Sequence, residues 1–312
     1  MKKKSTMLRE LLGSGQIQLR PLVAIALQAK MAEALGFNVI GISGAYTAAH
    51  ILGLPDAGLI TMTEMVENAQ RVCNAVNIPV IADGDTGFGN AINVRRTVQA
   101  MIQAGAAAVF LEDQVAPKRC GFVLGKEVIS IEEAVGKIRA AVDARNEMDE
   151  DFVIMARTDA RTAAGGNLEE AIRRAKAYRE TGADIIYVEA VRSREEIMEI
   201  RRSIKGPLAC SAWDIKPYPT LQELQDLGLC MTLGLMFFEA GLIADWDMLV
   251  ALKERGLEYW YEWRDSVRDH PASWQKIYDL VGFPKIREWE EKYLVQDALK
   301  KYEQSSGLYE PR

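Results

Sequence analysis

The chain has 312 residues, of which 49% are hydrophobic and 26% are charged, a composition typical of a globular protein with a sizeable core. Its net charge of −6 argues against nucleic acid or an anionic membrane surface as a partner, because both require basic patches. No apolar run approaches the ~20 residues of a membrane span, and the first ten residues lack the apolar stretch of a signal peptide. The four cysteines have no CxxC spacing, so we expect reduced thiols and a cytoplasmic protein.

Short apolar segments alternate with amphipathic helical segments along most of the chain, after a short helix over 5–13. The predicted strands cover 22–25, 39–42, 78–82, 107–111, 152–156, 184–188, 207–210 and 229–233. The predicted helices cover 26–35, 61–76, 91–104, 131–146, 167–181, 193–203, 220–227 and 236–255, the second of them starting at a Thr61–Glu64 capping box. Eight apolar strands, each followed by a helix, predict a (β/α)₈ barrel rather than a doubly wound sheet. No linker divides residues 1–256, which we predict to be one domain.

The composition changes after residue 256. Residues 257–312 hold four of the six tryptophans together with charged helical stretches. We predict a helical C-terminal extension, which must pack on its own barrel or on a neighbouring subunit because this much aromatic surface is not stable in water.

Polar residues follow six of the predicted strands. In a parallel barrel the carboxyl ends of all strands meet on one face, where active sites lie. Six successive ends that supply acids, an arginine and hydroxyl groups therefore predict a site. The residues are Ser43, Asp83, Asp85, Glu112, Asp113, Arg157, Asp159, Glu189 and Ser211.

Two aspartates, Asp83 and Asp85, stand directly after an apolar strand in a glycine-rich turn. Buried unpaired carboxylates cost several kcal/mol, so they require a cation or hydrogen-bond donors. A hard divalent metal such as Mg²⁺ prefers carboxylate and water oxygens. The alternative is an Asp-Gly turn with solvated acids. The arginine beside the acids favours a metal bound together with an anionic substrate.

Cys120 differs from the other cysteines because it lies in a loop after a strand. Its neighbours Lys118 and Arg119 are expected to favour the thiolate and lower the thiol pKa. The alternative is an incidental surface thiol. Cys73, Cys210 and Cys230 lie in helical or strand patterns and are expected to be core residues.

Five segments together resemble the isocitrate lyase/phosphoenolpyruvate mutase superfamily, in order over about residues 15–255. They are Ser43-Gly44, Asp83–Gly89, Glu112-Asp113-Gln114, Pro117–Gly121 and Ala156–Ala160. The resemblance implies an α/β barrel whose eighth helix is exchanged between neighbouring subunits of a dimer or tetramer. It also implies catalysis through an enolate with Mg²⁺, for which Mn²⁺ is an alternative.

The resemblance also implies roles for the acids and the loop. Asp85 resembles the direct metal ligand, Asp83 and Glu112 hold its waters, and Asp56 is a further acid of that network. The segment Lys118–Gly121 resembles the mobile gating loop of the carbon–carbon lyases, in which the cysteine is the acid/base. Mutase loops usually lack this cysteine.

Other positions correspond to the family's substrate-binding residues. Ser43, Gly44 and Ala45 resemble the cradle for the α-keto-acid carboxylate, and Arg157 resembles the arginine that binds a substrate carboxylate. The residues expected around the substrate are completed by Tyr46, Gly121, Glu189 and Ser211.

Three positions depart from the family. Phe122 follows Cys120-Gly121 where the lyase loop has histidine. Ser211 and Asp214 stand where an asparagine and a glutamate are common, and Glu239 stands where methylisocitrate lyases carry an arginine.

From these residues we expect a Mg²⁺-dependent lyase that cleaves a 2-hydroxy dicarboxylate of the malate type, with or without alkyl substituents, into an α-keto acid and a second carboxylate. The alternatives are a methylisocitrate lyase, an oxaloacetate (2-oxo acid) decarboxylase, a phosphoenolpyruvate or carboxyphosphonoenolpyruvate mutase, and a non-catalytic barrel scaffold. The general base is open between Tyr46 and a metal-linked water or carboxylate.

Overall fold

The computed structural model describes residues 2–235, 237–307 and 309, which form two compact units, Met1–Phe238 and Glu239–Arg312. The sequence analysis placed a boundary after residue 256 instead. The helix α10 (Phe238–Arg255) therefore lies almost entirely in the second unit. That α10 serves as the eighth helix of a barrel stays a prediction.

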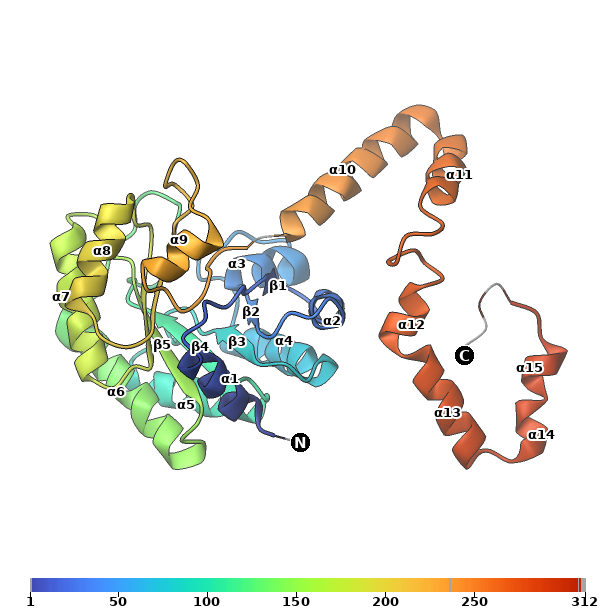
Figure 1. The fold of residues 1–312 in the computed structure, drawn as a ribbon, viewed down its shortest axis with the longest axis horizontal. Helices are drawn as coiled ribbons and strands as arrows, with labels where there is room; N and C mark the ends of the chain where they lie inside the picture. The colour runs from blue at the N-terminus through green and yellow to red at the C-terminus, as the bar shows by residue number, and fades with distance from the viewer. Residues whose placement is uncertain (1, 236, 308, 310–312) are drawn as a thin grey trace. The chain divides into compact units, whose positions relative to one another are not determined.

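The first unit is built on a curled parallel sheet whose strands are neighbours in the order of the chain (Figure 1). Its seven strands are β1 (Leu22–Val23), β2 (Ile40–Ile42), β3 (Val80–Asp83), β4 (Ala108–Glu112), β5 (Val153–Thr158), β6 (Ile185–Val188) and β7 (Leu208–Cys210). This arrangement confirms the predicted barrel-like fold.

The predicted eighth strand does not form a regular strand in the described part of the chain. Residues 229–235 nevertheless lie where such a strand belongs. The Cys230 N–H donates to the Leu208 carbonyl at 2.8 Å on one side. Single parallel bridges from Met231 to Gln18 and from Leu235 to Pro21 connect the other side to the chain before β1. The sheet thus closes through an irregular segment.

Helices surround the sheet, as the alternating pattern predicted (Figure 1). They are α2 (Ala26–Ala34), α4 (Met62–Ala75), α5 (Ala91–Gln103), α6 (Ile131–Met148), α7 (Leu168–Glu180), α8 (Arg194–Ser203) and α9 (Leu221–Asp226), with α1 (Lys4–Gly13) before β1. The Thr61–Glu64 capping box is present at the start of α4. The connection after β2 holds two short elements that were not predicted, α3 (Gly44–Thr47) and a π-helical turn, η1 (Ala48–Leu52).

Alternate strand residues divide the core in two. One apolar cluster lies between the sheet and the helices and includes Ala82, Val109, Ile154 and Ile186. The other lies inside the curled sheet and includes Ile81, Phe110, Met155, Ile185 and Tyr187. Because side chains alternate along a strand, the residue two positions after an inward-facing one also faces inward.

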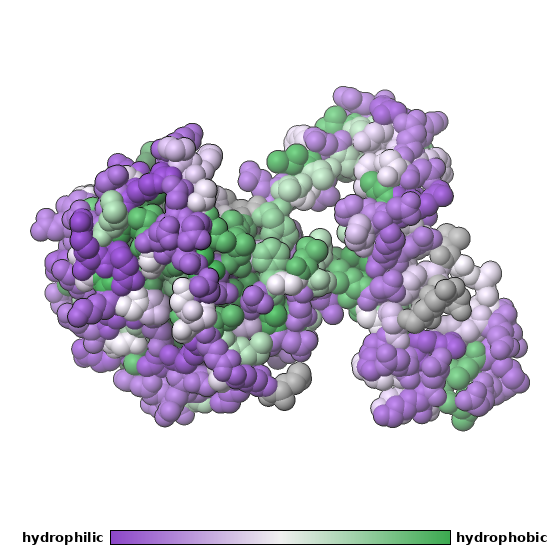
Figure 2. All heavy atoms as spheres, in the orientation of Figure 1, coloured by the Kyte–Doolittle hydropathy of each residue, from purple (hydrophilic) through white to green (hydrophobic). Residues whose placement is uncertain are grey.

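The second unit consists of helices with little core of their own. They are α10, α11 (Leu257–Ser266), α12 (Ile277–Val281), α13 (Phe283–Tyr293), α14 (Gln296–Leu299) and α15 (Lys301–Gln304). Trp246 is 71% exposed and Trp289 47% exposed, and apolar side chains lie along the surface of α10 (Figure 2). Within the described ranges, no helix of either unit combines the length and apolar character that a bilayer span requires.

Candidate active site

The strand register gathers the charged residues at one end of the sheet. Asp83, Glu112, Arg157 and Glu189 each stand two residues after an inward-facing core residue, so all four side chains continue the inward rows at the carboxyl ends of their strands. Glu112 pairs with Arg157 across β4 and β5. This convergence was predicted from the strand ends.

The turn after β3 holds its two aspartates in fixed positions. The Asp85 N–H donates to Asp83 Oδ1 at 2.9 Å, and the Glu112 N–H donates to the Asp85 carbonyl at 2.9 Å. Asp85 adopts a left-handed conformation with φ of 44°. Strain of this kind persists only where the surrounding structure fixes it, and here it directs a second carboxylate toward the same point as the first.

Glycine is required at residue 44 because the backbone passes directly over the acids. The Gly44 N–H donates to Asp83 Oδ2 at 2.7 Å. A Cβ atom there would lie 2.7 Å from that oxygen and 3.0 Å from Asp85 Oδ1. Ser43 caps α3 by accepting from the Tyr46 N–H at 3.4 Å. The expected carboxylate cradle of Ser43, Gly44 and Ala45 thus lies against the acids, with one of its N–H groups already bound to Asp83.

Lys118 carries the cation nearest to these acids. Its ammonium lies 2.9 Å from Asp85 Oδ1 and forms an ion pair with Asp56. The lysine side chain is only 5% exposed although it belongs to a loop. The predicted neighbourhood of Asp56, Asp83, Asp85 and Lys118 is therefore present.

Burial controls the protonation of the acid cluster. Loss of solvation, together with the neighbouring Asp85, raises the pKa of Asp83 to about 7. Burial also raises the pKa of Asp85 and brings that of Glu112 well above its usual range. Burial alone would lower the pKa of Lys118, but Glu112 and the aspartates raise it well above the ordinary lysine value. The buried acids therefore hold their protons more firmly than free carboxyl groups do, and an added cation would favour their ionised forms.

The acids fit a hard divalent cation. Glu112 Oε1 is buried without a hydrogen-bond donor among the described residues, and the buried Asp85 Oδ1 has only its ion pair with Lys118 there. Within 2–235, 237–307 and 309, no three Asp, Glu, His or Cys side chains lie at metal-ligand spacing. Mg²⁺ commonly uses one or two carboxylates and keeps several waters, so Asp85 as ligand with Asp83 and Glu112 holding waters suits this geometry.

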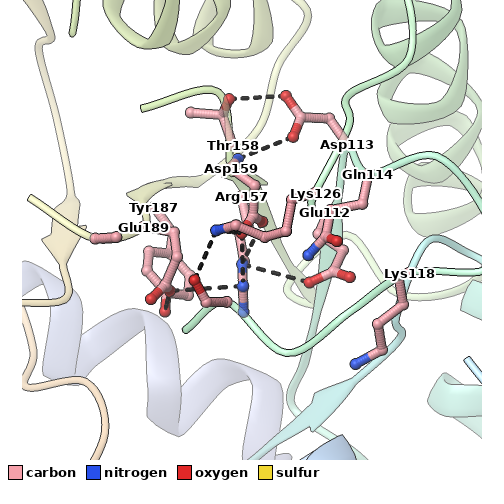
Figure 3. Close-up of polar contacts among 12 residues, drawn as sticks. Glu112, Asp113, Gln114, Lys118, Lys126, Arg157, Thr158, Asp159, Tyr187 and Glu189 are labelled. Carbon is pink, nitrogen blue, oxygen red and sulfur yellow. Dashed lines mark hydrogen bonds and ion pairs between the residues drawn. The ribbon is translucent and has the colours of Figure 1, made fainter. Parts of the chain in front are cut away.

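Arg157 stands at the centre of the charged residues (Figure 3). Its Nε donates to Asp159 Oδ2 at 2.8 Å and its Nη2 to Asp159 Oδ1 at 3.0 Å, which fixes the guanidinium plane. Glu112 Oε2 lies 3.4 Å from Nε, and Glu189 Oε2 lies 3.7 Å from Nη2. Burial would lower the pKa of Arg157, but Asp159, Glu189 and Glu112 raise it well above its usual value, so the guanidinium stays charged.

The opposite side of Arg157 is formed by β6, β7 and the loop. Glu189 accepts from Ser211 Oγ at 2.9 Å and also binds the Tyr187 hydroxyl. A Cβ atom at Gly121 would lie 2.6 Å from Arg157 Nη2 and 3.0 Å from the Glu189 side chain. The loop backbone at Gly121 therefore lies directly against the guanidinium, and Gly121, Glu189 and Ser211 are together as expected.

Two residues of the site were not predicted from the sequence. Lys126 is 3% exposed, and its ammonium donates to Asp159 Oδ1 at 2.9 Å and to the Gly121 carbonyl at 2.7 Å, which ties the loop to β5 (Figure 3). Tyr187 lies beneath Arg157, with its ring centre 5.2 Å from the guanidinium carbon. Tyr187 could have been predicted to face the site, because it stands two residues after the inward-facing Ile185. Lys126 could not, because a lysine in a polar loop has no pattern that indicates a buried position.

The prediction that the thiol of Cys120 has a lowered pKa is wrong. Burial of the thiol is the largest effect and raises its pKa, and Asp56 adds to this. Arg157 and Lys118 lower it by less, because the charge of Lys118 is taken up by Asp56 and Asp85. The Cys120 N–H donates to the Asp56 carbonyl at 3.1 Å, which holds the loop backbone at Cys120 against Asp56, and the raised pKa keeps the thiol in its neutral form.

The remaining predicted positions are spread more widely. The Tyr46 ring packs on Phe238, with ring centres 3.7 Å apart. Asp214 is exposed two residues after Ala212. Glu239 begins the second unit, so its expected place near the substrate stays a prediction.

A curled parallel sheet that collects buried acids, one fixed arginine and a loop thiol at its carboxyl ends defines an α/β-barrel enzyme. The chain belongs to the phosphoenolpyruvate phosphomutase family, whose model matches residues 19–234. It is thus an enzyme of the phosphoenolpyruvate mutase/isocitrate lyase superfamily, as the sequence motifs indicated.

Relatives and solved structures agree with this assignment. The chain is 42% identical to a 2,3-dimethylmalate lyase of Eubacterium barkeri over 289 residues, which cover 92% of this chain and 96% of the relative. It is 39% identical to a 2-methylisocitrate lyase of Aeropyrum pernix over 286 residues, covering 91% and 89%.

Among solved structures, a 2,3-dimethylmalate lyase matches with a TM-score of 0.85 at 29% identity, covering 99% of this chain and 100% of that one. A phosphonopyruvate hydrolase in complex with oxalate and Mg²⁺ matches with a TM-score of 0.81 at 33% identity, covering 94% and 100%.

Proposed function

We propose that this enzyme is a Mg²⁺-dependent carbon–carbon lyase that cleaves a 2-hydroxy dicarboxylate of the malate type. The observation that carries the proposal is the pair of buried carboxylate oxygens beside Arg157, Glu112 Oε1 without a hydrogen-bond donor among the described residues and Asp85 Oδ1 paired only with Lys118. Such a pair suits a metal and a bound carboxylate in one site. The neutral Cys120 thiol at the same place suits a proton donor.

Two groups of residues bind the carboxylates of the substrate. Arg157, oriented by Asp159, binds a carboxylate, and the α3 segment at Ser43 and Ala45 supplies hydroxyl and backbone groups for the α-keto-acid carboxylate. Asp85, with Asp83 and Glu112, holds Mg²⁺. When bound, the metal acts as a Lewis acid that stabilises oxyanion charge developing on the keto-acid half.

Cleavage follows a retro-aldol course. A base removes the proton of the 2-hydroxyl group, the oxygen electrons form the carbonyl of the α-keto acid, and the C2–C3 bond breaks. The electron pair of that bond passes to C3, and the Cys120 thiol protonates it to give the second carboxylate. The base is Tyr46 or a carboxylate of the acid cluster, and its proton later restores the thiol.

Other reactions of the superfamily make different demands. A mutase transfers a phosphoryl group and does not need a general acid such as Cys120 to protonate a carbanion. The relative that cleaves 2-methylisocitrate makes this tricarboxylate the second candidate substrate. Glu239 in place of an arginine, and Phe122 in place of a histidine, favour a smaller acid.

The test is an assay of the metal-depleted protein with and without Mg²⁺ on 2,3-dimethylmalate, malate, 2-methylisocitrate, oxaloacetate and phosphonopyruvate. We expect keto acid from a substituted malate, dependent on Mg²⁺ and lost in Asp85→Asn. Release of CO₂ from oxaloacetate or of phosphate from phosphonopyruvate as the main reaction would contradict the lyase, and a preference for 2-methylisocitrate would replace the substrate.

We also propose that the enzyme is a cytoplasmic homo-oligomer, a dimer or tetramer. The four free thiols support a reducing compartment. The exposed tryptophans of the second unit support a subunit contact, because apolar surface of this kind is otherwise covered in stable proteins.

A further inference from the structure

Two aromatic rings from different loops meet beside the site. Phe122, in the loop after Cys120-Gly121, packs on Trp213, in the loop after β7, with ring centres 5.0 Å apart and planes tilted by 40°. Phe122 remains 47% exposed, so its ring has a face available to a ligand. Neither aromatic side chain takes part in the acid cluster or the Arg157 contacts.

The Trp213 ring is fixed by the irregular segment that closes the sheet. Its Nε1 donates to the Leu233 carbonyl at 3.2 Å. At Gly234, where φ is +77°, an added Cβ atom would lie 1.8 Å from the indole ring. Only glycine leaves room for the ring at this point, so the indole edge that carries Nε1 and Cζ2 is held against the backbone.

Both rings belong to loops that lie against the side chain of Glu189. Phe122 follows Gly121, which has no space for a side chain against Arg157 Nη2 and Glu189. Trp213 comes two residues after Ser211, whose hydroxyl donates to Glu189 at 2.9 Å. The two loops therefore bring one apolar surface to the edge of the site, next to the groups that bind the substrate.

We propose that Phe122 and Trp213 form an apolar wall that contacts an alkyl group on C3 of the substrate, an assignment that rests on the lyase function proposed above. Aromatic faces exclude water and favour a methyl group over a hydrogen or a carboxylate. One methyl group in an apolar pocket changes specificity by about 10- to 200-fold. The wall thus selects C3-alkylated malates.

The sharpest comparison uses 2-methylmalate and 2,3-dimethylmalate, which differ only by the C3 methyl group. We expect the wild-type Mg²⁺ enzyme to favour 2,3-dimethylmalate by about 10-fold or more, both in kcat/KM and in affinity measured by calorimetry. Phe122→Ala and Trp213→Ala should each reduce this preference by about 5-fold or more. In the double variant the fold-reduction of this preference should be smaller than the product of the two single fold-reductions, because the two rings form one surface.

Tyr218→Ala is the matched control, because Tyr218 is an aromatic residue of the same loop as Trp213 but is 68% exposed. Its variant should keep the wild-type preference. Phe122→His should retain a ring and shift specificity toward 2-methylisocitrate.

The binding and turnover measurements separate the two claims. Absence of cleavage of every acid tested overturns the lyase. If wild type shows no binding preference for the C3 methyl group, the proposed apolar wall is wrong. It is also wrong if both alanine variants keep the wild-type preference.

Discussion

The ammonium of Lys118 lies 2.9 Å from Asp85 Oδ1, the oxygen that we expect to ligate the metal. The same ammonium pairs with Asp56. A lysine and a divalent cation cannot share one carboxylate oxygen at this distance without strong repulsion. We therefore expect metal binding to be coupled to the position of the Lys118 loop, which also carries Cys120.

Lys118→Met should destabilise the metal-free protein more than the Mg²⁺ form. Without metal, the substitution leaves buried acids uncompensated, which costs about 3 kcal/mol when one partner of a buried pair is removed. Mg²⁺ supplies the missing charge and should recover most of this loss. Denaturant unfolding with and without Mg²⁺ measures the difference.

Lys137→Met is the control for that measurement. Lys137 is also buried, but it donates to the Thr86 backbone carbonyl at 3.1 Å. The loss of stability in Lys137→Met should be the same with and without Mg²⁺. An equal loss for Lys118→Met in both conditions would argue against competition for Asp85.

Asp85→Asn should weaken Mg²⁺ binding by about 100-fold or more, because altered outer-shell partners alone cost 10- to 100-fold. The amide keeps the size of the side chain, so the protein should stay folded. Calorimetry with Mg²⁺ and circular dichroism check the two statements. Asp151→Asn, which alters a carboxylate that accepts from Thr6 and pairs with Arg9 instead, should bind Mg²⁺ as wild type does.

The strands and the converging acids could be predicted because both follow from local pattern. Apolar runs such as 107–111 are long enough to be strands, and the residue after each run must lie at the same end of a parallel sheet. The irregular eighth segment could not be predicted, because Met231 and Leu235 contact the chain before β1 through single bridges. The state of Cys120 was missed because the burial that raises its pKa, and the acids Asp56 and Asp85 that pair with Lys118, depend on residues distant in sequence.

Cys120→Ala should reduce kcat by about 100-fold or more, the usual effect of losing a general acid. Because burial raises the pKa of the Cys120 thiol, it should be alkylated slowly at pH 7. The alkylation rate should rise only above the ordinary thiol pKa of about 8.5. Fast alkylation at pH 7 would indicate a thiolate and would contradict a proton-donor role.

Cys210→Ala serves as the comparison for Cys120. Cys210 is 3% exposed at the end of β7, and burial raises its pKa. We expect a loss of about 1 kcal/mol in stability and an unchanged kcat.

Removal of residues 257–312 should lower the oligomeric state measured by light scattering. The second unit exposes Trp263 and Trp289, and burying such side chains at a subunit contact is strongly favourable. Trp246→Glu should have the same effect through α10, and the exposed Glu254→Gln should have none. An unchanged assembly after truncation would assign this segment to contacts within one chain.

Arg157→Lys should weaken oxalate binding to the Mg²⁺ enzyme by about 10- to 100-fold, the range expected for a lost hydrogen bond to a charged group. The guanidinium plane is fixed by two hydrogen bonds to Asp159, and lysine keeps the charge but cannot reproduce this planar geometry. Arg161→Lys is the matched control, because Arg161 makes the same kind of paired contact with Glu196, at 2.6 and 3.1 Å. Calorimetry should show wild-type oxalate affinity for that variant. Equal affinities for both variants would mean that the substrate carboxylate is bound by other groups.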